Sequence, residues 1–206
     1  TPMPHPSLKK TLLNLLEDIN DPRQAILLKI YLDHAKLFHS TLGSSHNHQA
    51  WDGGYADHIA ECLRVNEVVY DALSEIRPLT FSKASGAIAL FFHDIEKPFK
   101  YGPKTNAECL RWQTQCADKH NGDWEAVKYD ILDDFEIKYG LTFTDEEQNA
   151  LKYTHGEGND HRKDHRVASP LAAHVHHCDN TSARIWFDDG KGLSANVSFS
   201  GTSNVA

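Results

Sequence analysis

The sequence lacks any apolar stretch approaching the ~20 residues that a membrane-spanning helix needs. Residues 1–5, Thr-Pro-Met-Pro-His, do not resemble a signal peptide, which needs a basic segment followed by an apolar one. The cysteines form no Cys-x-x-Cys pair, and without a secretory signal they are expected to be reduced thiols. We therefore expect a cytoplasmic protein with no membrane partner.

Negative residues outnumber positive ones, 29 Asp and Glu against 21 Lys and Arg, so the net charge is −8 at pH 7. A protein that follows a nucleic acid backbone needs a basic surface, so the charge argues against a long nucleic acid as a partner of this chain. The charge does not exclude a small phosphorylated substrate, since bound metal ions can supply positive charge locally.

Apolar residues at helical spacing run through most of the chain, and strand-like patterns are confined to its end. The expected fold is an all-α helical bundle forming a single domain over residues 1–206. Within it we expect an N-terminal helix in 1–21, a core over about 22–187 and an extended or hairpin-like tail at 188–206. The helices expected around the candidate site cover 22–42, 54–77, 82–95, 123–139, 145–155 and 170–183, while 99–120 gives no firm assignment.

The pair His93-Asp94 follows the apolar run 87–92. An imidazole and a carboxylate at the end of a buried helix are costly to desolvate unless something compensates them. A divalent metal does so, because neutral imidazole and carboxylate are both good ligands. His58 and Asp179 lie on other expected helices, so the pattern predicts a metal site assembled from several helices.

The order and context of these residues resemble those of the HD superfamily of metal-dependent phosphohydrolases. The segment 53–58 is similar to the Gly-Gly-x-x-x-His that opens the first ligand helix in several HD proteins. Residues 90–97 are similar to the family's "LLHDIGK", and 176–180 to its "HHADN". The resemblance covers roughly residues 45–187 and implies an HD-type helical bundle.

The resemblance implies that His58, His93, Asp94 and Asp179 bind one divalent ion, which could be Mn, Fe, Ni, Co, Mg or Zn. Many HD proteins bind a second ion through two further histidines, with the HD aspartate bridging the ions. His120 and His155 fit that pattern by order and context. His176 could be a ligand or a partner of one, because it shares a helix face with Asp179.

Catalysis would then depend on Asp94, the carboxylate common to the ions, and on Lys97, which matches the lysine of "HDIGK". Glu96 departs from that motif, which has glycine there, and this leaves the role of Lys97 open. Other residues that could contact a substrate phosphate lie in the loop between two ligand segments. They are Arg162, Lys163 and Arg166.

The leading functional hypothesis is hydrolysis of a nucleotide or similar small phosphoester by metal-activated water. A second hypothesis is a di-iron oxygenase acting on a small organic substrate, since a minority of HD proteins use the same ligands for two irons. A 3′–5′ exonuclease and a non-catalytic regulatory module are also compatible with the pattern. The ligands alone do not separate these functions.

Overall fold

A computed structural model describes residues 10–45 and 48–186, and within those ranges every regular element is a helix. The helices are α1 (Leu12–Glu17), α2 (Gln24–Phe38), α3 (Gly54–Ile76), α4 (Lys83–Phe92), α5 (Lys97–Tyr101), α6 (Ala107–His120), α7 (Trp124–Tyr139), α8 (Asp145–Tyr153) and α9 (Pro170–Arg184), with a 3-10 turn, η2 (Gly158–Asp160). The expected all-α fold is confirmed.

Local capping signals explain where several of these helices begin. Thr144 and Glu147 form a capping box at α8, in which each side chain bonds the backbone N–H of the other. Ser169 caps α9 and is followed by a proline at the first helical position. Asp123 caps α7, which ends at Gly140 in the left-handed conformation that glycine adopts without strain.

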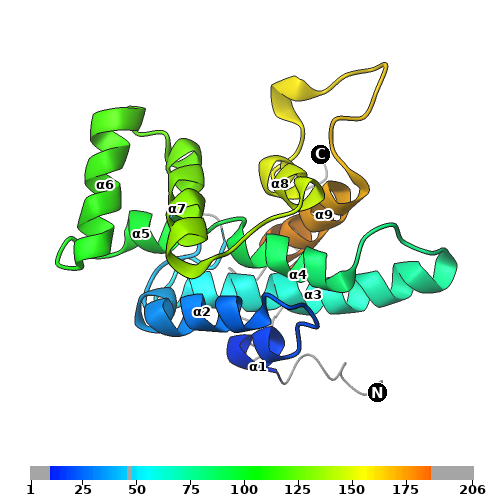
Figure 1. Cartoon of the computed structure of the whole chain (residues 1–206), viewed down its shortest axis with the longest axis horizontal. Coiled ribbons are helices and arrows are strands. Elements are labelled where there is room, and N and C mark those ends of the chain that lie inside the picture. Colours follow the sequence, from blue (N-terminus) through cyan, green and yellow to red (C-terminus); the bar gives the residue numbers. More distant parts are fainter. Residues whose placement is uncertain (1–9, 46–47, 187–206) are drawn as a thin grey trace, which may run out of the picture.

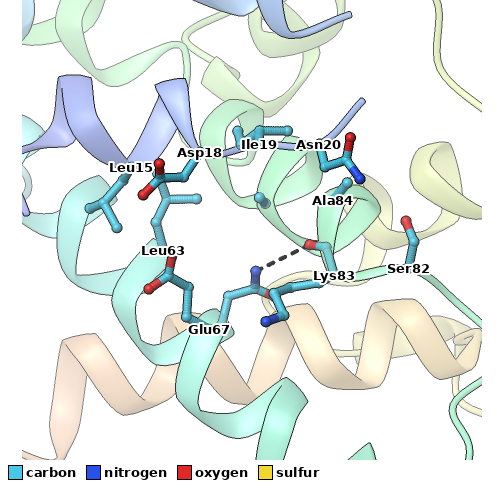
Figure 2. Close-up of a pocket in the computed structure, with 11 residues that line it drawn as sticks. Leu15, Asp18, Ile19, Asn20, Leu63, Glu67, Ser82, Lys83 and Ala84 are labelled. Atoms are coloured by element: carbon cyan, nitrogen blue, oxygen red, sulfur yellow. Dashed lines mark hydrogen bonds between the residues drawn. The ribbon is translucent and has the colours of Figure 1, made fainter. Parts of the chain in front are cut away.

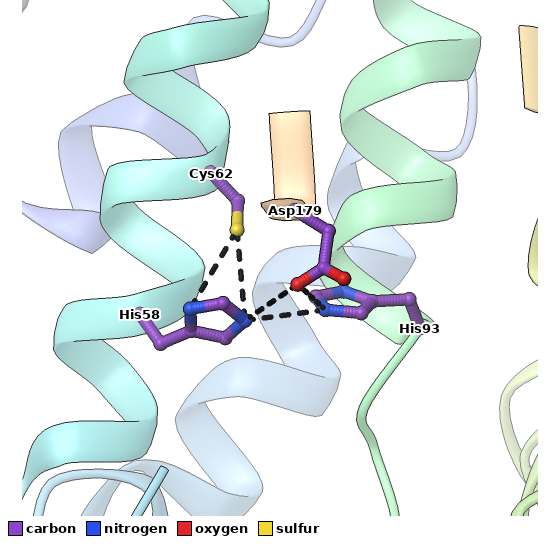
Figure 3. A group of neighbouring side chains, drawn as sticks. All are labelled: His58, Cys62, His93 and Asp179. Carbon is purple, nitrogen blue, oxygen red and sulfur yellow. Dashed lines mark hydrogen bonds and ion pairs between the residues drawn. The ribbon is translucent and has the colours of Figure 1, made fainter. Parts of the chain in front are cut away.

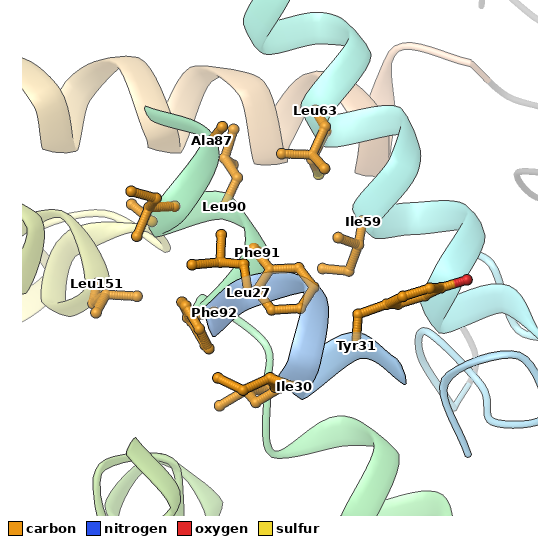
Figure 4. Packing of buried hydrophobic residues seen from close by; sticks show 14 of the residues in the cluster. Leu27, Ile30, Tyr31, Ile59, Leu63, Ala87, Leu90, Phe91, Phe92 and Leu151 are labelled. Carbon is orange, nitrogen blue, oxygen red and sulfur yellow. The ribbon is translucent and has the colours of Figure 1, made fainter. Parts of the chain in front are cut away.

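The core is centred on α4, whose residues from Gly86 to Phe92 are all buried. This helix contacts α3, α8 and α9, which confirms the central place expected from its nearly continuous apolar character. Figure 4 shows Phe91 and Phe92 packed against side chains from α2 and α3, including Leu27 and Ile59. The helix that precedes His93 and Asp94 is therefore held in place by buried apolar side chains.

The helices form two groups above the base made by α2 and α3 (Figure 1). On one side α8 and α9 pack together against α3 and α4, and on the other α6 and α7 stand as a separate pair. This division decides which sequence-distant histidines can share a site.

Several helix boundaries differ from the sequence-based expectation. The second helix begins at Gln24, because Asp21 accepts a hydrogen bond from the backbone N–H of Arg23 at 2.8 Å and forms a turn before the helix. That helix ends at Phe38, four residues short of the expected end at 42. The unassigned stretch 99–120 contains most of α5 and all of α6.

The C-terminal tail expected to be extended lies outside the described residues from 187 onward. The last helix was expected to end at residue 183, but Arg184 is the last residue of α9 and Ile185 keeps right-handed helical angles. No helix in the described ranges combines the length and apolarity needed to cross a membrane.

Candidate metal centre

Four predicted ligands come together between α3, α4 and α9. His58 lies in the second turn of α3, and Asp179 lies on α9. His93 and Asp94 follow α4, because that helix ends at Phe92 and the chain continues in turns up to α5. Figure 3 shows His58, His93 and Asp179 pointing toward one another from these separate segments.

The distances between the donor atoms fit a single small cation. Nε2 of His58 lies 3.3 Å from Nε2 of His93 and 3.2 Å from Oδ1 of Asp179. Nε2 of His93 lies 3.3 Å from the same oxygen of Asp179. Oδ2 of Asp94 lies 3.5 Å from Nε2 of His58 and 3.2 Å from Nε2 of His93. Ligand atoms placed tetrahedrally 2.0–2.2 Å from a zinc-like ion would be about 3.3–3.6 Å apart, and these five distances are close to that range.

Nδ1 of each imidazole, in His58 and His93, has a hydrogen-bond acceptor, and this determines whether Nε2 carries a proton or a lone pair. Nδ1 of His93 lies 2.7 Å from the carbonyl oxygen of Leu90 and must donate to it. Nδ1 of His58 lies 3.0 Å from Oγ of Ser182, whose hydroxyl donates to Glu61. Both neutral rings therefore carry their proton on Nδ1 and direct an Nε2 lone pair at the same point. A proton or a metal ion must lie between them.

The charges around this point favour a cation. Burial alone would lower the pKa of His93, but the carboxylates of Asp94 and Asp179 raise it to about 10. Burial opposes ionisation of the two carboxyls, yet their basic neighbours hold the pKa of each well below its usual range. Without a metal, the buried cluster therefore retains a proton on His93 between ionised carboxylates.

His155 approaches the opposite side of the same carboxylates. Its Nε2 lies 3.5 Å from Oδ1 of Asp94 and 3.8 Å from Oδ2 of Asp179, the oxygens that do not face His58. Oδ1 of Asp94 is buried and has no hydrogen-bond partner among the described residues. The His155 side chain is 53 % exposed, whereas those of His58 and His93 are fully buried. This side of the cluster is therefore open to solvent.

His176 is a structural neighbour of this open side. Its Nδ1 bonds the carbonyl oxygen of Thr154 at 2.5 Å, which ties α9 to the turn that carries His155. His176 belongs to neither group of described residues that could hold a metal, and its role stays a prediction.

The structure does not bring His120 to the cluster, so its prediction as a ligand disagrees with this fold. Two groups of described residues could hold a metal, and neither includes His120: His58, Cys62, His93 and Asp179, and His93, Asp94, His155 and Asp179. It ends α6, in the helix pair on the far side of Figure 1, where Nε2 lies 2.7 Å from Oδ2 of Asp130 on α7. Sequence order matched the family pattern, but packing of α6 on α7 carries His120 away from α8 and α9.

The candidate substrate residues lie in two environments. Nζ of Lys97 lies 2.5 Å from Oδ2 of Asp94 and is largely buried, so in this structure it neutralises a ligand. Arg162, Lys163 and Arg166 are all exposed in the loop between α8 and α9. The Arg162 guanidinium donates to the carbonyl oxygens of Asn159 and His161 within that loop.

Glu96, which stands where the resemblance has glycine, adopts right-handed helical angles at the N-cap position of α5, and its side chain makes no capping bond. The backbone after the ligands therefore makes no left-handed turn at this position. The Glu96 side chain is buried, and burial together with the charge of Asp94 raises its pKa to about 7.

Sequence reasoning missed several residues around His58. The sulfur of Cys62 lies 3.7 Å from Nε2 and 3.8 Å from Nδ1 of His58, about equally far from both ring nitrogens. Burial raises the pKa of Cys62 well above its usual range, which keeps it a thiol. The ring of His48 lies 4.9 Å from that of His58. His46 lies outside the described residues.

A separate cavity of about 350 Å³ lies between α1, α3 and α4 (Figure 2). Its acidic side chains, Asp18 and Glu67, both pair with Lys10, at 2.7 and 3.1 Å. None of the candidate ligands lines this cavity.

Comparisons with protein-family models, with curated proteins and with solved structures gave no match for this chain.

Proposed function

We propose that this chain is a metal-dependent phosphohydrolase of the HD superfamily that hydrolyses a nucleotide or a similar small phosphoester. The observation that supports it most is the convergence of the Nε2 lone pairs of His58 and His93 on the carboxylates of Asp94 and Asp179. The four residues occur in the order and contexts that the family resemblance implies.

A divalent ion bound by these residues would polarise a phosphoryl oxygen and lower the pKa of water. The chain's own part is to hold the four donors before the ion arrives. The buried acceptors on Nδ1 fix both imidazole rings, and the packing of α4 fixes the turn that carries His93 and Asp94. Because the donors are already held in position, metal binding would lose less conformational entropy in ordering them.

The substrate would approach from the side of His155. That ring is the exposed member of the cluster, while His58 and His93 close the other side completely. The carboxylate oxygens facing His155 are available for a second ion, which would have fewer protein ligands than the first because His120 lies elsewhere. Lys97 would contact the phosphate once a bound ion takes its place beside Asp94. Arg162, Lys163 and Arg166 would add positive charge from the exposed loop.

The test is an activity screen with metal-stripped protein reloaded separately with Mn, Co, Ni, Mg, Zn or Fe. Mono-, tri- and cyclic nucleotides and a short single-stranded oligonucleotide serve as substrates, with phosphate and nucleoside products separated by chromatography. Asp179→Asn should remove activity, and Asp130→Asn, which changes a carboxylate outside the site, should keep it.

Hydrolysis of small nucleotides that depends on Asp179 would support the proposal. Processive release of mononucleotides only from the oligonucleotide would favour the exonuclease. Consumption of dioxygen by the iron-loaded protein, with no phosphate released under any metal, would replace hydrolysis by the oxygenase hypothesis. Metal uptake without any of these activities would favour the hypothesis of a non-catalytic regulatory module.

A further inference from the structure

A short hydrogen-bonded chain behind His58 joins the two helices that carry ligands. Nδ1 of His58 on α3 bonds Oγ of Ser182 on α9 at 3.0 Å. The Ser182 hydroxyl in turn donates to Oε1 of Glu61 on α3 at 2.8 Å. Ser182 is buried, so this hydroxyl is shielded from competing water.

The sequence spacing of this chain matches that of the ligands. Glu61 lies three residues after His58 on α3, and Ser182 lies three residues after Asp179 on α9. Residues three apart lie on the same face of a helix. The hydrogen bond between His58 and Ser182 therefore forms one turn away from the contact between Asp179 and His58. It helps to set how α3 and α9 are aligned.

The buried side-chain amide of Gln49 holds the carboxylate of Glu61 in place. Nε2 of Gln49 donates to Oε1 of Glu61 at 3.2 Å and lies 3.4 Å from Oγ of Ser182. Gln49 itself has a left-handed backbone with φ of 43°, and the close approach of Gly54 to its carbonyl leaves no room for a Cβ at residue 54. The tight turn before α3 thus fixes the amide that orients Glu61.

We propose that Ser182 and Glu61 are positioning residues for the metal centre, an inference that rests on the metal centre proposed above. Because Glu61 accepts the Ser182 proton, Ser182 Oγ can only accept from Nδ1–H of His58. This fixes the tautomer of His58 whose Nε2 carries a lone pair toward the cluster. Without Glu61, the hydroxyl is free to donate to Nδ1, and the proton of the neutral ring would move to Nε2, where it blocks metal binding.

The experiment combines metal affinity with a direct measurement of the tautomer. Dissociation constants for Zn and Co are measured by competition with a chelator for wild type, Ser182→Ala, Glu61→Ala and Glu61→Gln. Long-range proton–nitrogen NMR of metal-free protein with labelled histidine reports which ring nitrogen carries the proton, and the signals missing in His58→Gln identify residue 58. The matched control is Ser74→Ala, an exposed serine on α3 whose hydroxyl bonds the carbonyl oxygen of Asp71.

We expect Ser182→Ala and Glu61→Ala to weaken metal binding by about 10–100-fold and to increase the population of His58 with its proton on Nε2. Glu61→Gln keeps an acceptor oxygen and should recover most of the affinity, and Ser74→Ala should change nothing. If Ser182→Ala fails to fold, the contrast between Glu61→Ala and Glu61→Gln carries the same test.

Unchanged affinity and tautomer in Ser182→Ala and Glu61→Ala, with normal metal uptake by wild type, would overturn this inference and leave the proposed function intact. Equal weakening by Glu61→Ala and Glu61→Gln would also overturn it. Absence of metal uptake by the wild type would instead overturn the metal centre itself.

Discussion

Nε2 of His58 faces Nε2 of His93 at 3.3 Å, and each ring has a hydrogen-bond acceptor at its Nδ1. Two neutral imidazoles in this arrangement would direct their lone pairs at each other. The buried carboxylates of Asp94 and Asp179 add negative charge at the same point. Such a cluster is stable only around a cation, and the predictions below separate a proton from a metal ion in that role.

Replacement of Asp94 should remove metal binding without unfolding the helices. Asp94→Asn deletes a charged donor that approaches both His58 and His93, so we expect metal affinity to fall by at least about 100-fold, above the range seen for residues behind the ligands. Binding is followed by calorimetry and helicity by far-ultraviolet circular dichroism. Asp130→Asn is the control, and metal binding equal to wild type in Asp94→Asn would exclude Asp94 as a ligand.

The histidines His120 and His155 should differ in their effect on metal stoichiometry. His120 pairs with Asp130 away from the cluster, so His120→Ala should bind as much metal as wild type. His155 reaches the free oxygens of Asp94 and Asp179, so His155→Ala should lose any second ion while retaining the first. Elemental analysis after dialysis measures both. A loss of one ion in His120→Ala alone would show that α6 reaches the site in the metal-bound protein.

Lys97 should oppose metal binding and favour substrate binding. Its ammonium lies 2.5 Å from Oδ2 of Asp94, the oxygen that also faces the two histidines. Lys97→Met removes this competing cation, so metal affinity should rise several-fold while KM for a phosphoester increases about tenfold, as for loss of a charged hydrogen bond. A lower metal affinity in Lys97→Met would show that the ion pair holds Asp94 in its binding position.

His174 predicts a pH dependence of stability that is independent of the metal site. Its Nε2 lies 2.8 Å from Oδ1 of Asn66, its Nδ1 is buried without a hydrogen-bond partner in the described part of the chain, and burial lowers its pKa to about 4. The unfolded chain takes up this proton near pH 6.5 and the folded protein only near pH 4, so stability falls as the pH decreases between these values. From pH 7 to pH 5 the loss should be about 2 kcal/mol.

The measurement compares urea unfolding of wild type and His174→Gln at the two pH values in the presence of a chelator. Because both proteins retain the cluster histidines, the difference between them isolates residue 174. His165→Gln is the matched control, since His165 is exposed in the loop between α8 and α9. An identical pH dependence in wild type and His174→Gln would show that His174 accepts a proton in the folded protein.

Local signals in the sequence predicted those parts of the fold that local interactions determine. The capping residues Thr144 and Ser169 act locally, because each side chain accepts a hydrogen bond from a backbone N–H within the helix that it starts. The end of α4 was predicted too late, since its apolar pattern continues through Ile95 although the helix stops at Phe92.

The candidate ligands could be predicted from their motifs, but their surroundings could not. The contacts of Ser182 with His58 and Glu61 depend on how α3 and α9 align, which neither helix encodes alone. For His120 the motif itself was misleading. Its place in the sequence fits the family pattern, but α6 packs on α7 and His120 pairs with Asp130 away from the site.

The central claim, a metal ion between His58, His93, Asp94 and Asp179, is tested most directly by anomalous X-ray diffraction from crystals grown with zinc or manganese. Data collected on both sides of the metal absorption edge give a difference map of the metal alone, and crystals grown with a chelator are the control. We predict a peak about 2.0–2.2 Å from Nε2 of both histidines and from one oxygen of each aspartate. A map without a peak at this position, with the four side chains in the same arrangement at saturating metal, would contradict the claim and leave a buried proton as the cation.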